Sequence, residues 1–198
     1  MLKRVFDIFF SLSGLFFLII PFAIIAILIK SEDGGPVFYR GERVGLRGKP
    51  FRIYKFRTMV VNAEKIGPAS TSDDDPRITK IGRFLRKYKL DELPQLINVL
   101  KGEMSFVGPR PEVKKFTDLY TEEEKAILSV RPGITDWASL WNSDEGSILA
   151  GVEDPDRVYM EKIRPEKIRL QLKYVRERSL WVDIKIIFKT IKTVMFGA

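Results

Sequence analysis

The chain has 198 residues, of which 45% are hydrophobic and 30% charged, a composition typical of one folded domain. It contains no cysteine and no histidine, which excludes disulfide scaffolds, thiol nucleophiles, Ser-His-Asp catalysis and the usual zinc sites, so any metal should be a hard ion held by oxygen. The formal net charge of +8 predicts attraction to nucleic acid, to an anionic bilayer surface or to a phosphorylated substrate.

The first predicted element is an apolar run from Ile8 to Ile29 that contains no charged residue. The run is long enough to enter a bilayer, and the residues after it do not resemble a signal-peptide cleavage site. Pro21 lies inside the run and cannot donate a hydrogen bond to the carbonyl of Phe17, so we expect the helix to kink or break there. The resulting halves, of about 20 Å and 12 Å, are each shorter than about 30 Å of hydrocarbon.

Lysine and arginine flank this run on both sides, so the positive-inside bias does not assign its two ends to opposite faces of a membrane. The pattern favours a re-entrant helix over residues 1–30 that enters one leaflet and returns. A single-pass anchor is the alternative. Residues 31–198 are then expected to form one domain on the cytoplasmic face.

The next predicted element is a β-hairpin over residues 37–59, with two extended stretches joined near residues 45–50. Lys55 and Arg57 are two residues apart in the second stretch, so they should project from one face, where they would grip a phosphate. Basic and aromatic residues also alternate in nucleic-acid-binding proteins, and a solvated strand face is the simplest alternative.

Two amphipathic helices are predicted, a weaker one over residues 78–88 and a stronger one over residues 179–196. In the second, Lys185, Lys189 and Lys192 fall on one helical face and apolar residues fill the others. This pattern is typical of a helix that lies on acidic lipid headgroups. A core helix with a lysine stripe facing solvent is an equally good interpretation.

Between these helices, Asp91 and Glu92 stand side by side where a helix over residues 92–100 is expected to begin. Asp91 at or near the N-cap of this helix is the plain interpretation. Arg83 and Arg110 belong to a group of cations on both sides of the pair, and a helix N-terminus among cations is a good phosphate site. Mg²⁺ bound by a carboxylate would bridge the opposite charges.

The order of four motifs along nearly the whole chain resembles the monotopic phosphoglycosyl transferases, also called bacterial sugar transferases. The motifs are "KRVFD" before the apolar run, then "YKFRTM", "KLDELPQLINVLKGEMSFVGPRP" and "VRPGIT". The resemblance implies a membrane-embedded α+β enzyme with a re-entrant helix broken at a proline, a small β-hairpin and several interfacial helices. It also implies the bacterial inner membrane, with the catalytic domain on its cytoplasmic face.

The activity that the resemblance implies is transfer of a phosphosugar from a UDP-sugar to polyprenyl phosphate, which releases UMP and begins the assembly of a glycoconjugate. It makes Asp91 the nucleophile that forms a covalent phosphosugar intermediate, and it gives Mg²⁺ to Glu92 and Asp91. Residues of the matching motifs are assigned to the donor phosphates and nucleotide, together with Arg83 from the cations before the pair: Lys55, Arg57, Arg110 and Arg131. The N-terminal motif and the helix-breaking proline are assigned to seating at the membrane: Lys3, Arg4, Asp7 and Pro21.

The sequence departs from the family at two places. Ile20 precedes Pro21 where family members often carry serine, and residues after Gly133 resemble only part of the family, in a region where we expect the sugar to be chosen. The expected partners are a UDP-sugar, polyprenyl phosphate and anionic lipids, with no nucleic acid, and a homodimer is left open. Two rival functions are a membrane-anchored nucleic-acid-binding protein and a non-catalytic scaffold at the membrane surface.

Overall fold

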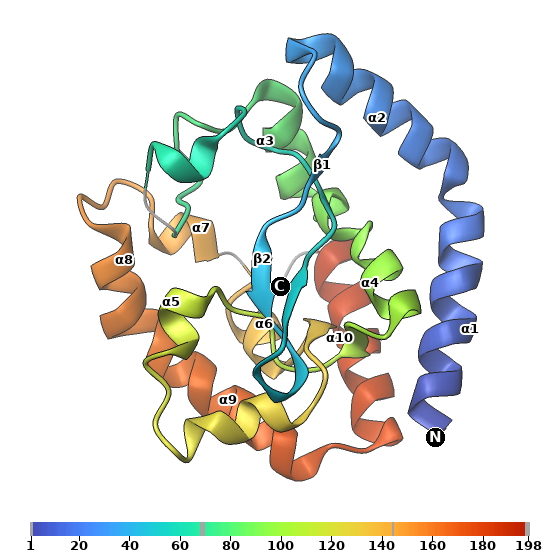
Figure 1. Cartoon of the computed structure of the whole chain (residues 1–198), viewed down its shortest axis with the longest axis vertical. Helices are drawn as coiled ribbons and strands as arrows, with labels where there is room; N and C mark the ends of the chain where they lie inside the picture. The colour runs from blue at the N-terminus through green and yellow to red at the C-terminus, as the bar shows by residue number, and fades with distance from the viewer. Residues whose placement is uncertain (1, 68–69, 144, 197–198) are drawn as a thin grey trace.

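The computed structural model describes residues 2–67, 70–143 and 145–196. A long bent pair of helices forms one edge of the molecule and the remaining elements pack beside it (Figure 1). The α-helices are α1 (Leu2–Phe17), α2 (Ile19–Asp33), α3 (Lys80–Lys87), α4 (Gln95–Lys101), α5 (Lys114–Thr117), α6 (Trp137–Trp141), α7 (Glu145–Ile148), α8 (Pro155–Val158), α9 (Arg164–Glu177) and α10 (Leu180–Phe196).

Short helices and strands make up the rest of the described chain. Four 3₁₀ helices are η1 (Leu46–Gly48), η2 (Ala63–Lys65), η3 (Leu90–Glu92) and η4 (Glu124–Ser129), and a π-helix is η5 (Tyr159–Ile163). The strands are β1 (Phe38–Tyr39), β2 (Glu42–Val44), β3 (Pro50–Arg52), β4 (Lys55–Phe56), β5 (Ser105–Val107) and β6 (Gly133–Thr135). The described chain is therefore mixed and rich in helix, which confirms the α+β class in its coarse form.

The bend between α1 and α2 is 61° and falls at Leu18. Pro21 is in the first turn of α2, where its missing N–H leaves the carbonyl of Phe17 without its regular donor. The break predicted at this proline is confirmed, but α2 runs on to Asp33 and is longer than the predicted 12 Å. Within the described residues no single helix is both long and apolar enough to cross a membrane, whereas the bent pair meets that test of length and composition.

Helix α1 packs along α4, which explains why it is only partly exposed. Arg4 donates through Nη1 to the carbonyl of Val99 at 2.5 Å and through Nη2 to that of Leu100 at 2.8 Å. Both carbonyls lie in the last turn of α4, where that of Val99 also accepts from the backbone nitrogen of Gly102 at 3.0 Å. A Cβ on Gly14 would lie 3.1 Å from Leu96 Cδ1, so the two helices approach closely at this glycine.

Two further residues of α1 bind the protein interior. Lys3 forms an ion pair with Asp183 of α10 at 2.5 Å and donates to the carbonyl of Val107 at 3.0 Å. Asp7 is buried and accepts a hydrogen bond from Ser105 Oγ at 3.0 Å. Lys3 and Asp7, two of the residues assigned from the sequence to membrane seating, thus hold α1 on β5 and α10, and their contact with lipid stays a prediction.

Helix α2 packs on the body through one face. Ile25 and Ile29 are buried together with Leu85 of α3 and Phe56 of β4, and Leu90 is half-buried against them. Phe56 follows Lys55 in the chain and Leu90 precedes Asp91. The apolar contact between α2 and the body therefore lies directly beside two of the predicted site residues.

The predicted hairpin is confirmed, although its ladder is interrupted. Strand β2 pairs antiparallel with β3 across the η1 turn, and β1 pairs antiparallel with β4 with Tyr39 opposite Lys55. The sequence did not predict the parallel pair of β5 and β6, in which Ser105 lies opposite Gly133. A Cβ on Gly133 would lie 2.1 Å from the backbone nitrogen of Gly108, so this close pairing requires glycine.

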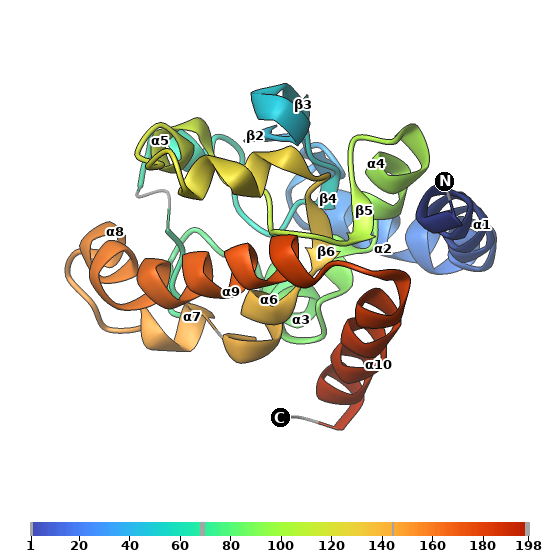
Figure 2. The same ribbon diagram turned by 90° about the horizontal axis from the view of Figure 1, so that it is seen from below.

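Both predicted amphipathic helices form. Helix α10 extends away from the body toward the C-terminus (Figure 2). Its side chains Trp181 and Phe188 are 75% and 69% exposed, and Asp183 and Ile186 are buried at its inner face. This exposure contradicts the core-helix alternative and is typical of a surface that meets a membrane or another apolar partner. In α3, Phe84 is exposed as well.

Candidate functional site

The acidic pair lies in a tight turn that precedes α4. Asp91 and Glu92 belong to the 3₁₀ helix η3, which Lys89 introduces with a left-handed φ of 55°. Helix α4 begins at Gln95 and its N-cap is Pro94. The predicted helix over residues 92–100 therefore starts later, at Gln95, and Asp91 is not its N-cap. The plain capping interpretation of Asp91 is wrong.

The carboxylate of Asp91 is nearly buried and weakly partnered. The residue is 7% exposed, and its one ion pair in the described part of the chain is with Lys55 Nζ at 4.0 Å. No described group donates a hydrogen bond to it. A buried carboxylate normally finds such donors, because an unpaired charge is costly away from water. Asp91 thus keeps oxygen lone pairs that no described donor uses.

Glu92, by contrast, is held by two cations. Lys55 Nζ donates to Glu92 Oε1 at 2.6 Å, and Arg110 donates to both oxygens of the same carboxylate, through Nη1 to Oε2 at 3.1 Å and through Nη2 to Oε1. A two-point arginine contact fixes orientation as well as charge. The structure therefore brings together four of the predicted site residues, two carboxylates and two cations, from β4, η3 and the segment after β5.

The environment separates the pKa values of the two neighbouring carboxyls. Burial raises the pKa of Asp91, and the negative charge of Glu92 adds to the shift against the opposing charge of Lys55. Burial also disfavours ionised Glu92, but Arg110 and Lys55 outweigh it and hold the pKa of Glu92 well below its usual range. Burial lowers the pKa of Lys55, although Glu92 opposes that shift. Glu92 is thus the fixed anion of the site and Asp91 the more basic carboxylate.

Helix α3 contributes Arg86 to the site, one helical turn after Arg83, the residue predicted from the sequence. Arg83 is exposed and has no described contact with the pair, whereas the positive charge of Arg86 acts on Asp91. Arg86 is half-buried near the end of α3. Helical spacing does not distinguish Arg83 from Arg86, because residues three apart on a helix share a face and differ by one turn in height. Lys55, Arg86 and Arg110 together outnumber the two carboxylates.

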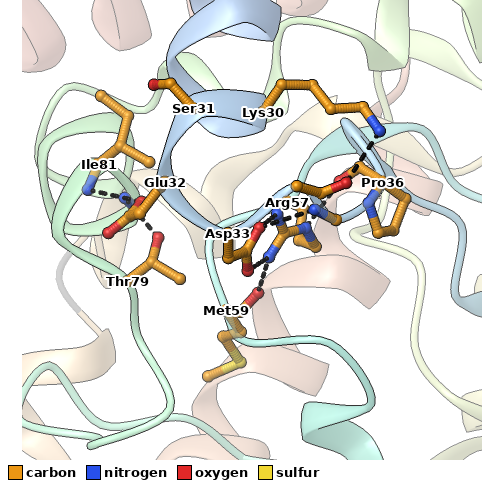
Figure 3. Close-up of polar contacts among 12 residues, drawn as sticks. Lys30, Ser31, Glu32, Asp33, Pro36, Arg57, Met59, Thr79 and Ile81 are labelled. Carbon is orange, nitrogen blue, oxygen red and sulfur yellow. Dashed lines mark hydrogen bonds and ion pairs between the residues drawn. The ribbon is translucent and has the colours of Figure 1, made fainter.

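The structure does not bring Arg57 to the acidic pair. Its guanidinium binds Asp33 at the end of α2, through Nη1 at 2.7 Å and through Nη2 at 2.5 Å, as Figure 3 shows. It also donates to the carbonyl of Pro36 at 2.6 Å and to that of Met59 at 3.0 Å. Most of its donors are therefore used by the protein itself, and its assignment to donor phosphate stays an untested prediction.

The neighbouring residue of α2 makes a second tie. Glu32 accepts hydrogen bonds from the backbone nitrogens of Lys80 at 2.7 Å and Ile81 at 3.4 Å, at the start of α3 (Figure 3). A carboxylate at a helix N-terminus is favourable for both hydrogen bonding and the helix dipole. The end of α2 is thus fixed to α3 by Glu32 and to β4 through Arg57, which gives Arg57 a structural role that the sequence did not predict.

Arg131 also lies away from the pair. It is exposed and donates through Nε to the carbonyl of Gly102 at 2.9 Å, just after the end of α4, whereas Asp91 and Glu92 precede the start of that helix. Its proposed contact with the nucleotide is untested.

The donor set is compatible with Mg²⁺. Among the described residues no group of three or more acidic side chains is placed to hold a metal. Mg²⁺, however, is commonly bound by one or two carboxylates and completed by waters and substrate phosphates. Asp91 has free oxygen lone pairs, and Glu92 Oε2 accepts one described hydrogen bond, from Arg110. A Mg²⁺ site that waters and substrate phosphates complete needs no third carboxylate.

The family model described as bacterial sugar transferase matches residues 1–197. The chain belongs to the bacterial sugar transferase family. A relative in Aeromonas hydrophila, named UDP-N-acetylgalactosamine-undecaprenyl-phosphate N-acetylgalactosaminephosphotransferase, is 42% identical over 175 residues, which cover 87% of this chain and 38% of that protein. A relative in Escherichia coli K12, named UDP-glucose:undecaprenyl-phosphate glucose-1-phosphate transferase, is 38% identical over 196 residues, which cover 96% of this chain and 39% of that protein.

This bacterial sugar transferase therefore spans about two fifths of the length of those two relatives. A third relative is similar in size: the Bacillus subtilis protein named uncharacterized sugar transferase EpsL is 39% identical over 198 residues, which cover 98% of this chain and 87% of that protein. The family resemblance inferred from the four motifs is confirmed. The match includes α1 and α2 as well as the acidic pair, so the bent helices and the site belong to one family unit.

Proposed function

We propose that this chain transfers a phosphosugar from a UDP-sugar to polyprenyl phosphate, releasing UMP, through a phosphosugar intermediate on Asp91. The observation that carries this proposal is the buried, weakly partnered carboxylate of Asp91 beside a cluster of cations. The names of the relatives, which are undecaprenyl-phosphate sugar phosphotransferases, support the substrate classes. Those names carry different sugars, so the sugar is left to experiment.

In the first step, an oxygen of Asp91 attacks the phosphorus that bears the sugar. A bond forms between that oxygen and phosphorus, and the bond from phosphorus to the bridging oxygen of the diphosphate breaks. UMP leaves with the bridging oxygen and its electron pair. Asp91 needs no general base, because a carboxylate has no proton to lose, which agrees with a chain that contains no histidine. Its raised pKa makes it a stronger nucleophile than an exposed aspartate.

In the second step, an oxygen of the acceptor phosphate attacks the same phosphorus. The bond between phosphorus and Asp91 breaks, the carboxylate is restored, and the product is polyprenyl-diphosphate-sugar. The acceptor phosphate is an anion at the bilayer surface, and α2 packs beside Asp91 through Leu90. A site beside a membrane-embedded helix would meet this substrate without drawing its prenyl chain out of the bilayer.

The cations solve the main electrostatic difficulty, which is the approach of a carboxylate to an anionic diphosphate. Arg110 and Lys55 fix Glu92, and with Arg86 they give the site an excess of positive charge toward the phosphoryl oxygens. Asp91 and Glu92 would hold Mg²⁺, which when bound neutralises charge on the diphosphate and on the leaving UMP.

The experiment is UMP release by detergent-solubilised protein with Mg²⁺, polyprenyl phosphate and a panel of UDP-sugars, run beside Asp91→Asn. We expect release that selects one sugar, needs the acceptor for sustained turnover and falls at least about 1,000-fold in the variant. Intact mass after donor addition without acceptor should show one phosphosugar adduct. Full activity in Asp91→Asn would refute the mechanism, and a direct transfer would give turnover without the adduct.

A further inference from the structure

A buried charged cluster lies two residues beyond Arg110. Lys167 of α9 and Tyr159 of η5 are 7% and 3% exposed. Lys167 Nζ forms an ion pair with Glu112 Oε1 at 2.5 Å and donates to the hydroxyl of Tyr159 at 3.1 Å, and that hydroxyl donates to Glu112 Oε1 at 2.9 Å. The mechanism proposed above uses none of these three residues.

The π-helix η5 makes this cluster geometrically possible. In a regular α-helix residues eight apart, such as Tyr159 and Lys167, differ by about 80° around the axis. A π turn contains one extra residue, so these two positions behave as residues seven apart and differ by only about 20°. Both side chains therefore reach the same carboxylate of Glu112. This irregular turn lies between α8 and α9, where they face the segment that carries Arg110.

The segment from Gly108 to Glu112 is stiff, so the position of Glu112 determines that of Arg110. Pro109 and Pro111 restrict the backbone on both sides of the arginine. The backbone nitrogen of Arg110 donates to Asp136 Oδ2 at 3.3 Å, and the carbonyl of Glu112 accepts from the nitrogen of Val44 at 2.9 Å. Among the contacts described, the side chain of Glu112 ties this segment to α9 through Lys167.

A stability role alone does not explain the cluster. The removal of two charges from water is costly, and apolar residues of similar volume are often as stabilising as a buried ion pair. What a buried pair adds is a fixed relative position. Burial disfavours ionised Glu112, but the charge of Lys167 and the hydrogen bonds from Lys167 and Tyr159 together outweigh it and lower the pKa of Glu112, so its carboxylate is ionised at neutral pH and its contacts are directional.

We propose that Glu112 is a positioning residue for the transfer reaction, held by Lys167 and Tyr159, and that it sets where the Arg110 guanidinium meets Glu92 and the donor phosphates. The inference rests on the proposed function for its kinetic consequence. In this role Glu112 acts through Arg110 and does not itself contact the reacting atoms.

The test is a double-mutant cycle of Glu112→Gln and Arg110→Ala, with Glu124→Gln as the matched control. Glu124 is also a glutamate paired with a cation of α9, Arg164, at 2.7 Å, but it lies in η4 outside the Arg110 segment. We expect Glu112→Gln to lower kcat/KM for the UDP-sugar by about 10- to 100-fold, the range that a small misplacement of a binding group produces. In the Arg110→Ala background the same change should have less than about a twofold effect.

Glu124→Gln should lower the melting temperature while leaving kcat/KM within about twofold of the unaltered protein. Lys167→Met, which removes the charge from the other side of the pair, should reproduce Glu112→Gln. Independent multiplication of the Glu112→Gln and Arg110→Ala effects would overturn the proposal, and so would an equal kinetic loss in Glu124→Gln. If Glu112→Gln and Lys167→Met fold poorly, Glu112→Asp is the conservative variant. It keeps the negative charge, so its kcat/KM should lie between that of Glu112→Gln and that of the unaltered protein.

A second readout separates this inference from the proposed function. The side-chain guanidinium signal of Arg110 in nitrogen-15 NMR, identified by its loss in Arg110→Ala, needs no substrate. We expect it to shift and broaden in Glu112→Gln and to stay unchanged in Glu124→Gln. If no UDP-sugar reacts, the proposed function fails, yet this signal still decides whether Glu112 positions Arg110. An unchanged Arg110 signal in Glu112→Gln would refute the positioning role.

Discussion

Asp91 and Glu92 are adjacent in the chain, but their surroundings give them opposite effects on stability. Glu92 binds Lys55 and Arg110, so its ionised form stabilises the fold, whereas Asp91 is buried with one distant partner, so its ionised form destabilises the fold. This contrast follows from the difference between a satisfied buried charge and an unsatisfied one. It also separates the residue that holds the site from the residue that would react.

We therefore predict that Asp91→Asn raises the melting temperature at neutral pH while it removes activity. The folded pKa of Asp91 is raised above 3.8, so the folded state binds its proton more tightly than the unfolded state does. Ionisation then costs stability progressively as the pH rises through that raised pKa, and asparagine removes the cost. Differential scanning calorimetry at neutral pH measures the change. A lower melting temperature would show that Asp91 stabilises the fold, as a capping residue does.

We predict the opposite result for Glu92→Gln. The folded pKa of Glu92 lies well below 4.5, so its contribution to stability is present above 4.5 and is lost as the pH falls through the depressed value. The variant should be less stable than the unaltered protein at neutral pH, and the difference should close in acid below 4.5. Urea unfolding at a series of pH values measures it. A difference that stays constant down the series would contradict the ionic origin.

Arg57 provides a third prediction at this scale, because its structural ties compete with the role that its motif suggested. We expect Arg57→Lys to lower the free energy of unfolding by about 1 to 3 kcal/mol, since lysine cannot reproduce the two-point contact with Asp33 and the bonds to both carbonyls. The KM for the UDP-sugar should change less than about twofold, the limit for a site that keeps its own contacts. A tenfold rise in KM without loss of stability would instead support a phosphate contact.

At the residue scale, the sequence predicted the part of the site that lies close to the acidic pair. Lys55, Asp91, Glu92 and Arg110 come together as their motifs suggested. The sequence did not predict the direction of Arg57, because its partner Asp33 comes from another element, and side-chain partners across elements are set by tertiary packing. It also placed Arg83 where Arg86 acts, since helical register alone leaves one turn undetermined.

At the scale of elements, local signals predicted what local physics controls. Pro21 predicted the helix break and alternation predicted the hairpin, because each depends on residues close together in the chain. The parallel pair of β5 and β6 was missed, since its two strands are three residues each and its register depends on a contact between distant glycines. The π turn η5 was also missed, because no local pattern in residues 159–163 predicts a π-helix.

The bend between α1 and α2 is held by more than its proline. Arg4 and Asp7 fix α1 to α4 and β5, and Ile25 and Ile29 fix α2 to the body. We therefore predict that Pro21→Ala keeps the bend, although alanine would restore a hydrogen bond to the preceding turn. Spin labels on cysteines introduced at Leu2 and Ser31 measure it, since the chain has no cysteine of its own.

A straight helix between these two labelled positions would separate them by about 44 Å, and a bend shortens this distance. The unaltered protein and Pro21→Ala should give the same shorter distance. A distance near the straight value in Pro21→Ala would show that the proline alone sets the bend. The control is the protein that carries both Leu2→Cys and Ser31→Cys and keeps Pro21.

At the scale of the whole molecule, the bent pair holds the site from two sides. Helix α1 binds the end of α4, the helix that follows the acidic pair, and α2 packs against Phe56 and Leu90, the chain neighbours of Lys55 and Asp91. Movement of either α1 or α2 would therefore move the site. Helices α1 and α2 also carry the longest series of exposed apolar side chains in the described chain, with Phe17 at the bend 76% exposed. A membrane that received the bend would thus fix the site at its surface.

This arrangement predicts a re-entrant topology, which labelling of single introduced cysteines tests in intact cells and in inverted vesicles. Leu2→Cys at the start of α1 and Ser31→Cys near the end of α2 should both react with an impermeant thiol reagent only from the cytoplasmic side, because both ends of the bent pair return to one face. Phe17→Cys at the bend should stay unlabelled from either side until detergent is added, since it would lie in hydrocarbon. Labelling of Leu2→Cys and Ser31→Cys from opposite sides of the membrane would establish a spanning helix and refute the re-entrant topology.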